Sequence, residues 1–173
     1  MKYPRIVRHA AGGLRALAAL VLLALVVCSR WGVPTAVAQR ADVLVMIIAS
    51  STPVTDIPAD VVRTAFLGLR AEHRGVRLIA FNPMLRTPSR ERLDRVLLGI
   101  EPDEVGGFWV DQRVRDGRHP PRALPSDELA VRVVAQLPGA IACVPARLVV
   151  SGVRALRIDG KGPSDRGYLL APE

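Results

Sequence analysis

Residues 43–49 read VLVMIIA, and SSTP at residues 50–53 follows at once. The apolar run is continuous rather than alternating, is rich in β-branched residues, and ends where Ser, Thr and Pro favour a turn. A strand with apolar side chains on both faces needs cover on both faces, as in a sheet that lies between helices. This stretch therefore predicts a buried strand in a layered α/β domain.

Helical and strand patterns alternate downstream of this strand. Apolar spacing predicts helices near residues 61–69, 93–100, 102–113 and 129–137, and short apolar runs predict strands at 77–81, 140–144 and 153–158. Pro58 and Gly68 mark the two ends of the first helix, and Gly99 lies near the end of the second. Strands that alternate with helices indicate an α/β fold.

The domain boundaries follow from composition. Residues 39–160 carry the alternating pattern and are expected to form one domain. Residues 161–173 are rich in Gly, Pro and Ser, and we expect them to form a flexible C-terminal tail.

The segment upstream of the first strand has the layout of an export signal. A basic start from Lys2 to Arg15 precedes 14 uncharged residues, 16–29, which are too few for a membrane span of about 20 residues. Small residues at Ala36 and Ala38 form an A-x-A cleavage pattern. We therefore expect a signal peptide at residues 1–38, cleaved after Ala38, a periplasmic location, and contact with the membrane only during export. The alternative is an uncleaved amphipathic anchor.

Charge excludes several classes of function once this segment is set aside. The whole chain has 24 basic and 16 acidic residues, a net charge of +8. Residues 1–38 hold five of the basic residues and no acidic ones, so the remaining 135 residues have a net charge of only +3. Such a domain is long enough to bury a core but is not a strongly basic nucleic-acid binder.

Cysteine usage adds one expectation. Cys143 is the one cysteine downstream of the signal, so the mature chain has no internal disulfide, and it lies in the apolar run AIACV at residues 140–144. A thiol in such surroundings is expected to be buried and unreactive.

Two turns place hydroxyl groups between a strand and a helix: residues 50–52 and residues 87–90. Backbone N–H groups at a helix start, with hydroxyl donors and an arginine beside them, can bind an oxyanion. The candidate ligand-binding residues are Ser51, Thr52, Thr87, Ser89 and Arg90, with Arg86 flanking the second turn. The simpler alternative is that Thr87 and Pro88 are an ordinary helix cap, and that residues 50–53 are an ordinary turn.

Catalytic constellations are not found in the sequence. His73 and His119 have no acidic or histidine neighbour at metal-ligand spacing. No zinc-protease motif, nucleophile elbow or Walker nucleotide-binding loop occurs. We therefore expect no enzyme activity, no metal and no cofactor. A small hydrolase using His119 near Asp116 is the third hypothesis, ahead only of a nucleic-acid role.

Several short motifs, in order along residues 42–158, resemble the exported relatives of phosphate ABC transporter substrate-binding proteins. They are SSTPV at 50–54, FLG at 66–68, FW at 108–109, PPR at 120–122 and PGAIA at 138–142. The resemblance implies a type 2 periplasmic binding protein-like fold with a mixed sheet flanked by helices. It also implies phosphate or another small oxyanion as ligand, and an ABC permease as a candidate partner.

The chain departs from the family pattern in ways that bear on the ligand. Pro88 stands in the expected phosphate loop and removes one backbone donor. Cys143 ends a segment that in the family has Gly and Tyr, and the length corresponds to about one lobe of a two-lobed receptor. The alternative function is therefore an envelope interaction or adaptor protein that keeps the scaffold and has lost the ligand.

Overall fold

The computed structural model describes residues 43–171. The predicted signal peptide at residues 1–38, with its cleavage point after Ala38, lies outside the described residues. Within the described range, no helix combines the length and the apolar character that crossing a membrane requires.

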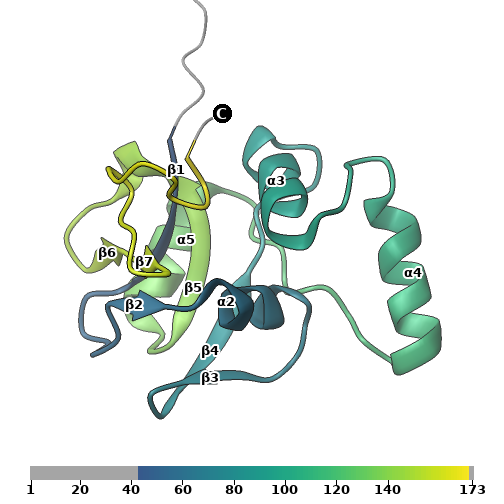
Figure 1. Cartoon of the computed structure of the whole chain (residues 1–173), viewed down its shortest axis with the longest axis horizontal. Coiled ribbons are helices and arrows are strands. Elements are labelled where there is room, and N and C mark those ends of the chain that lie inside the picture. The colour runs from purple at the N-terminus through teal and green to yellow at the C-terminus, as the bar shows by residue number, and fades with distance from the viewer. Residues whose placement is uncertain (1–42, 172–173) are drawn as a thin grey trace, which may run out of the picture. The chain divides into compact units, whose positions relative to one another are not determined.

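A five-stranded mixed sheet forms the centre of the domain, in the order β3-β4-β5-β1-β6 (Figure 1). Its strands are β1 (Leu44–Ala49), β3 (Ala71–His73), β4 (Val76–Phe81), β5 (Ala140–Pro145) and β6 (Val153–Ala155). β4 and β5 are parallel, whereas β1 is antiparallel to both of its neighbours, β5 and β6. The predicted α/β fold with a mixed sheet is confirmed.

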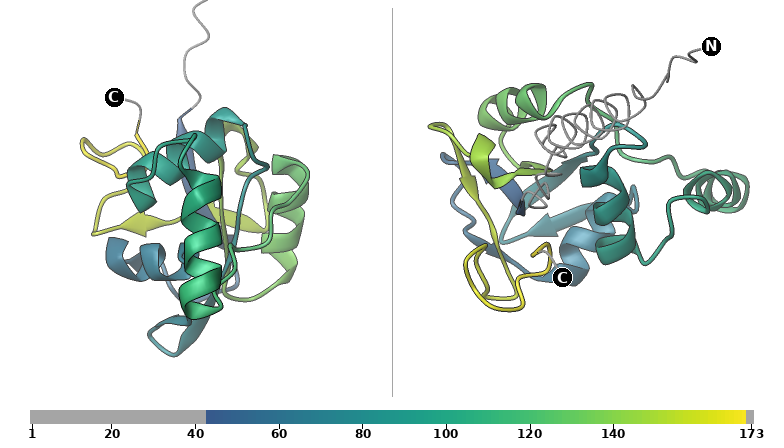
Figure 2. Two further views of the ribbon diagram at one scale, coloured as in Figure 1. Left: turned by 90° about the vertical axis from the view of Figure 1, so that its right-hand side faces the viewer. Right: turned by 90° about the horizontal axis from the view of Figure 1, so that it is seen from above.

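The core lies on both faces of the two central strands. Every residue of β1 and β5 is buried, and the two strands pair with Val45 opposite Val144 and Ile47 opposite Ala142. Helix α5 lies on one face of the sheet and α2 on the other (Figure 2). The interpretation of residues 43–49 as a strand covered on both faces is therefore confirmed.

The helices of the described range are α2 (Ala59–Phe66), α3 (Pro88–Leu93), a π-helical turn η1 (Asp94–Leu98), α4 (Val105–Asp116), α5 (Asp127–Gln136) and a 3-10 turn η2 (Ala146–Leu148). A side-chain cap is present at the start of α3 and α5, and not at the start of α2 or α4. The Ser126 hydroxyl accepts a hydrogen bond from the Leu129 N–H at the start of α5. Gly99 and Gly117 adopt the left-handed conformation and end η1 and α4.

The single strand expected at residues 153–158 is divided in the structure. β6 pairs with β1, whereas β7 (Arg157–Ile158) pairs with β2 (Asp56–Ile57) in a separate two-stranded sheet. Leu156, between them, donates its N–H to the Met46 carbonyl and is fully buried. The chain therefore changes sheets at Leu156.

The C-terminal segment also differs from the expectation of a flexible tail at residues 161–173. Tyr168 and Leu170 are buried in the main core. The Tyr168 hydroxyl accepts a hydrogen bond from the Met46 N–H and donates one to the Leu156 carbonyl. The packed domain therefore continues to the end of the described range, because two apolar side chains anchor a segment of turn-forming composition.

Candidate functional site

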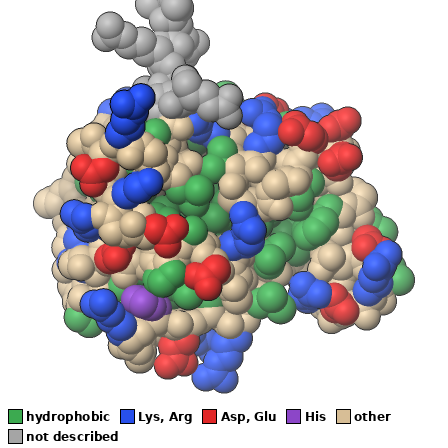
Figure 3. Space-filling view, in the orientation of Figure 1, with side chains coloured by type: hydrophobic (Ala, Val, Ile, Leu, Met, Phe, Trp, Pro, Cys, Tyr) green, Lys and Arg blue, Asp and Glu red, His purple; other side chains and the backbone are tan. Residues whose placement is uncertain are grey.

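A cavity of about 700 Å³ lies beside the carboxyl end of β4. Its walls come from α3 and η1, from the first turns of α4, and from the loop after α4 at residues 120–123. The space-filling view shows hydrophobic side chains between α4 and the rest of the domain, with acidic and basic side chains interspersed elsewhere on this face (Figure 3). The cavity surface is therefore largely apolar, and the charged side chains in its walls determine what it can hold.

Asn82 fixes the loop wall of this cavity. It directly follows β4, is buried, and exchanges backbone hydrogen bonds with Arg122 and Leu124. Its side-chain amide also donates to the Pro121 carbonyl at 3.2 Å. These three bonds extend the β4 ladder by one residue and hold the loop against the sheet edge.

Arg90 and Asp94 form a buried ion pair in the cavity wall. They stand one helical turn apart, and their side chains are 4% and 2% exposed. The Nε atom of Arg90 donates to both carboxylate oxygens of Asp94, at 2.8 and 2.7 Å. Because Asp94 takes only the Nε edge, it orients the guanidinium without using its two terminal nitrogens.

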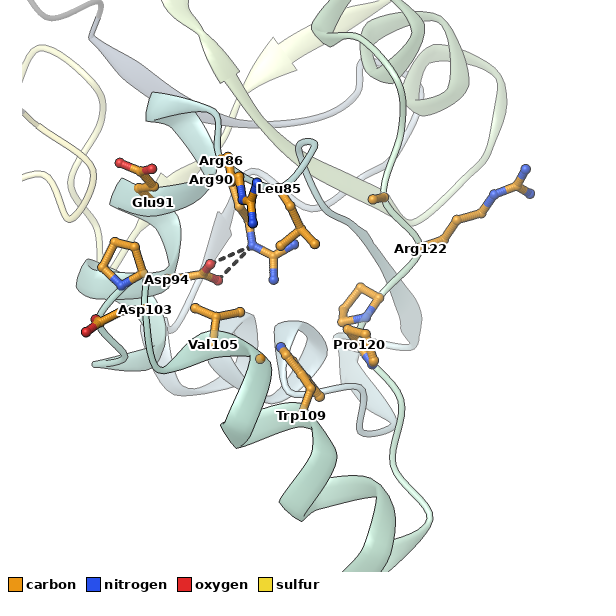
Figure 4. A pocket seen from close by; sticks show the side chains of 14 residues that line it. Leu85, Arg86, Arg90, Glu91, Asp94, Asp103, Val105, Trp109, Pro120 and Arg122 are labelled. Carbon is orange, nitrogen blue, oxygen red and sulfur yellow. Dashed lines mark hydrogen bonds and ion pairs between the residues drawn. The ribbon is translucent and has the colours of Figure 1, made fainter.

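The terminal nitrogens of Arg90 face the cavity (Figure 4). The carboxylates of Glu91 and Asp103 point away from them, and Arg122 extends in the opposite direction, out of the cavity (Figure 4). A guanidinium presents parallel N–H donors that match two oxygens of a carboxylate or phosphate. The polar centre of the cavity is thus a pre-oriented fork for an oxyanion.

Burial controls the protonation of the partner acid. It raises the pKa of the Asp94 carboxyl above its ordinary value, against the lowering effect of the hydrogen bonds and the charge of Arg90. Burial therefore disfavours the ionised form of Asp94, and the hydrogen bonds and charge of Arg90 favour it.

Trp109 forms the apolar wall opposite Arg90. It is 8% exposed and belongs, with Ile100 and Val105, to a small apolar cluster separate from the main core. Phe108 packs edge-on against its ring, with centroids 5.1 Å apart. The indole N–H is buried and has no hydrogen-bond partner among the described residues.

The two predicted hydroxyl turns lie at opposite ends of the sheet. β4 is parallel to β5, whereas β1 is antiparallel to β5. β1 and β4 therefore run in opposite directions, and their carboxyl ends lie at opposite ends of the sheet (Figure 1). Ser51 and Thr52 follow β1 and are therefore far from the cavity. There Ser51 is exposed, and the Thr52 N–H closes the turn onto the Ala49 carbonyl.

The turn at residues 87–90 adjoins the cavity but uses its hydroxyl as a cap. Thr87 Oγ1 accepts from the Arg90 N–H at 3.3 Å and donates to the Met84 carbonyl at 2.8 Å. Ser89 is half-buried and is not part of the cavity wall. Of the five predicted ligand residues, all within the described range, only Arg90 lines the cavity.

Sequence reasoning missed Asp94 and Trp109 as members of the site. The four-residue spacing of Arg90 and Asp94 was an available signal for a helical ion pair. The burial of this ion pair cannot be predicted from the sequence, because an exposed ion pair on a helix has the same spacing. The Phe108-Trp109 pair was noted as a motif, but only the fold shows that its ring faces Arg90.

The remaining candidate groups form no reactive cluster. Asp116 is ion-paired with Arg118 rather than with His119. Burial raises the pKa of the Cys143 thiol to about 12, which is the opposite of the shift that a nucleophile requires. Among residues 43–171, no three His, Cys, Asp or Glu side chains come together as metal ligands would.

No protein-family model and no curated protein matches the chain, whereas several solved structures do. An ABC-type phosphate transport receptor from Vibrio cholerae aligns over 71% of this chain and 48% of its own, with a TM-score of 0.54 and 12% identity. A protein from Clostridium perfringens, described as a phosphate ABC transporter substrate-binding protein with bound phosphate, covers 69% and 46%, with a TM-score of 0.52 and 13% identity. PstS from Borrelia burgdorferi covers 69% and 48%, with a TM-score of 0.50 and 12% identity.

These TM-scores show a shared fold, but sequence identity near 12% is too low to show a shared ligand. The chain spans about half the length of each receptor. The chain therefore has a fold similar to that of these phosphate-transport proteins, a periplasmic binding protein-like fold about one lobe in size.

Proposed function

We propose that the chain is an exported, non-enzymatic solute-binding-type protein that binds phosphate or a similar small oxyanion in the cavity beside β4. The observation that carries the proposal is Arg90: its guanidinium is buried, is oriented through Nε by Asp94, and presents its terminal nitrogens to the cavity. The likeness of the fold to phosphate transport receptors supports the same ligand class.

The anion would receive its hydrogen bonds from the Arg90 side chain and not from the start of α3. The Arg90 N–H already donates to the Thr87 hydroxyl, and α3 is only six residues long. Hydrogen bonds that involve a charged group contribute about 1.5–3 kcal/mol each, so a two-pronged contact is sufficient for measurable binding. Asp94 offsets the charge of Arg90, so recognition depends on the geometry of the fork more than on net charge.

The transport role is part of the same proposal. A single lobe leaves the anion partly open to solvent, and a partner that covers the cavity would raise affinity. An ABC permease is the partner that the structural neighbours suggest, since two are described as parts of phosphate ABC transport systems. An adaptor that has lost its ligand is the alternative, and no contact in the described domain favours it.

Isothermal titration calorimetry of the full chain with phosphate and with sulfate tests the proposal. We expect binding of at least one of these anions at millimolar concentration or below. Arg90→Lys should weaken it about tenfold, because lysine keeps the charge but lacks the planar fork, and one lost charge-assisted bond is worth about 1.5 kcal/mol or more. Absence of heat with both anions, or equal affinity of Arg90→Lys, would contradict the proposal.

Arg122→Ala is the matched control. Arg122 also lines the cavity, but its side chain extends away from Arg90 (Figure 4). We expect its removal to leave anion affinity unchanged. Circular dichroism of both variants should match the parent, which separates loss of the fork from loss of the fold.

A further inference from the structure

We infer that the preferred ligand of this cavity is an organic anion, with an oxyanion head on Arg90 and an apolar body about the size of one ring against Trp109. The inference rests on the proposed function and names the ligand class of the same site. Its basis is the size of the cavity, the chemistry of its walls and the scarcity of its polar groups.

The cavity is too large for an inorganic oxyanion alone. A water molecule takes about 30 Å³ in the liquid, so an ion of five heavy atoms fills on the order of 100 Å³. The cavity has about 700 Å³, which lies in the range of pockets for organic ligands. A phosphate ion on Arg90 would leave most of this volume to water against an apolar wall.

The walls favour an apolar body in the remaining space. Leu85, Val105 and Trp109 line the cavity together with Pro120 and Pro121. The Trp109 ring is held by its contact with Phe108 and by a cluster apart from the main core, so it presents a fixed aromatic surface. Burial of apolar ligand surface on such a wall stabilises binding by about 25 cal/mol per Å².

The buried polar groups provide one place for a charged head. Arg90 is the buried cation of the wall, Asp94 is bonded to it, and the Glu91, Asp103 and Arg122 side chains point away. Arg86 also lines the cavity, but it is exposed and lies beside Arg90, so its charge adds to the same place (Figure 4). The indole N–H of Trp109 is the one other buried donor of the wall without a partner in the described part of the chain. A ligand with one oxyanion head and an uncharged body matches this inventory, whereas a ligand with several separate charges does not.

Calorimetry with inorganic phosphate and phenyl phosphate on the full chain separates the two levels of the inference. We expect phenyl phosphate to bind about tenfold more tightly or better, since even one methylene in an apolar pocket is worth about tenfold. Equal affinity of the two would overturn the organic-anion inference and leave the proposed oxyanion function standing. If neither binds, or if Arg90→Lys leaves both affinities unchanged, the proposed function fails and this inference fails with it.

A pair of exposed side chains provides a test that does not threaten the fold. Leu85 lines the cavity and is 60% exposed, whereas its neighbour Met84 is 45% exposed and is not part of the wall. We expect Leu85→Ala to reduce the preference for phenyl phosphate over phosphate at least twofold, and Met84→Ala to leave it unchanged. Trp109→Ala should abolish the preference, and a preference that survives in both cavity variants would overturn the inference.

Discussion

Tyr168 shows how one hydroxyl group can replace a strand partner. β6 pairs with Ile47–Ala49 of β1, and the Met46 N–H beyond it is taken by the Tyr168 hydroxyl at 3.1 Å. The same oxygen donates to Leu156, where the chain passes from β6 to β7. The C-terminal segment is thereby fixed at the point where the ladder ends.

We expect Tyr168→Phe to lower the free energy of unfolding by about 1–3 kcal/mol at pH 7, because it leaves a buried N–H and a buried carbonyl unpaired. Burial raises the pKa of Tyr168 to about 12, from an unfolded value near 10. The native state therefore holds this proton more tightly, so its contribution is complete below pH 10 and is lost as pH rises toward 12.

Urea unfolding followed by circular dichroism between pH 7 and 11.5 checks both parts. The difference between the parent and Tyr168→Phe should shrink over the alkaline part of this range. Cys143, whose pKa is also raised to about 12, titrates in both proteins, and its thiolate charge adds to the shift of the Tyr168 pKa in the parent. A difference that is zero at pH 7, or that stays constant up to pH 11.5, would show that the hydroxyl does not have this role.

At the scale of single residues, sequence reasoning identified Arg90 and Cys143 and missed the partners that define them. The sequence predicts Arg90 as a ligand-binding residue, but its orientation depends on Asp94 and its surroundings on Trp109. Those relations require tertiary contacts, which spacing alone does not encode. The burial of Cys143 was predictable, because its neighbours in sequence are all apolar.

Among the elements, the junction between α5 and β5 depends on Gly139. Its φ is +78°, and a Cβ there would overlap the carbonyl oxygen of Arg77 in β4. The Gly139 carbonyl itself accepts a hydrogen bond from the Ile79 N–H of β4. Gly99 has a similar φ of +69° at the end of η1, but open space surrounds its missing side chain. A substitution at Gly99 would cause backbone strain alone, whereas one at Gly139 would cause backbone strain and steric overlap.

Gly99→Ala should cost about 1–2 kcal/mol of stability, which is the price of the left-handed conformation alone. Gly139→Ala should cost about 1–3 kcal/mol more, because the Arg77 carbonyl must also move. Thermal and urea unfolding of the two variants measure the difference directly. Equal losses would mean that the sheet accommodates the methyl group without strain.

Long periodic elements were predictable and short ones were not. The apolar runs of β1 and β5 and the stripes of α2 and α5 carry several repeats each. β2, β3, β6 and β7 have two or three residues, too few to establish a period. The direction of β1 relative to its neighbours was not predictable either, because a fully apolar run is compatible with both a parallel and an antiparallel ladder. That direction separates the two hydroxyl turns.

For the whole molecule, the cavity divides the domain into regions of unequal packing. α4 is attached through the small cluster around Trp109, and its other face leaves Val110 and Val114 64% and 80% exposed. The sheet, by contrast, is covered on both faces (Figure 2). Regions with few buried apolar contacts open at lower free energy than the core.

Amide hydrogen exchange should therefore be faster in α4 than in β1 and β5. Phenyl phosphate should slow exchange in α4 and leave the sheet unchanged, because α4 supplies one wall of the cavity. Exchange measured by mass spectrometry, with and without this probe, resolves the two regions. Protection of α4 equal to that of β5 without any anion would contradict this description.

The contact between Tyr168 and β1 also has a consequence for solubility. Without the C-terminal segment, the Met46 N–H would lose its partner at the end of the β1–β6 ladder, beside the apolar residues Leu44 and Val45, and only the Met46 carbonyl would stay bonded, to Leu156. An unpaired strand edge is a template on which another copy of the chain can add a strand. We therefore expect a chain shortened before Tyr168 to self-associate more readily than the full chain, even where its remaining elements are intact.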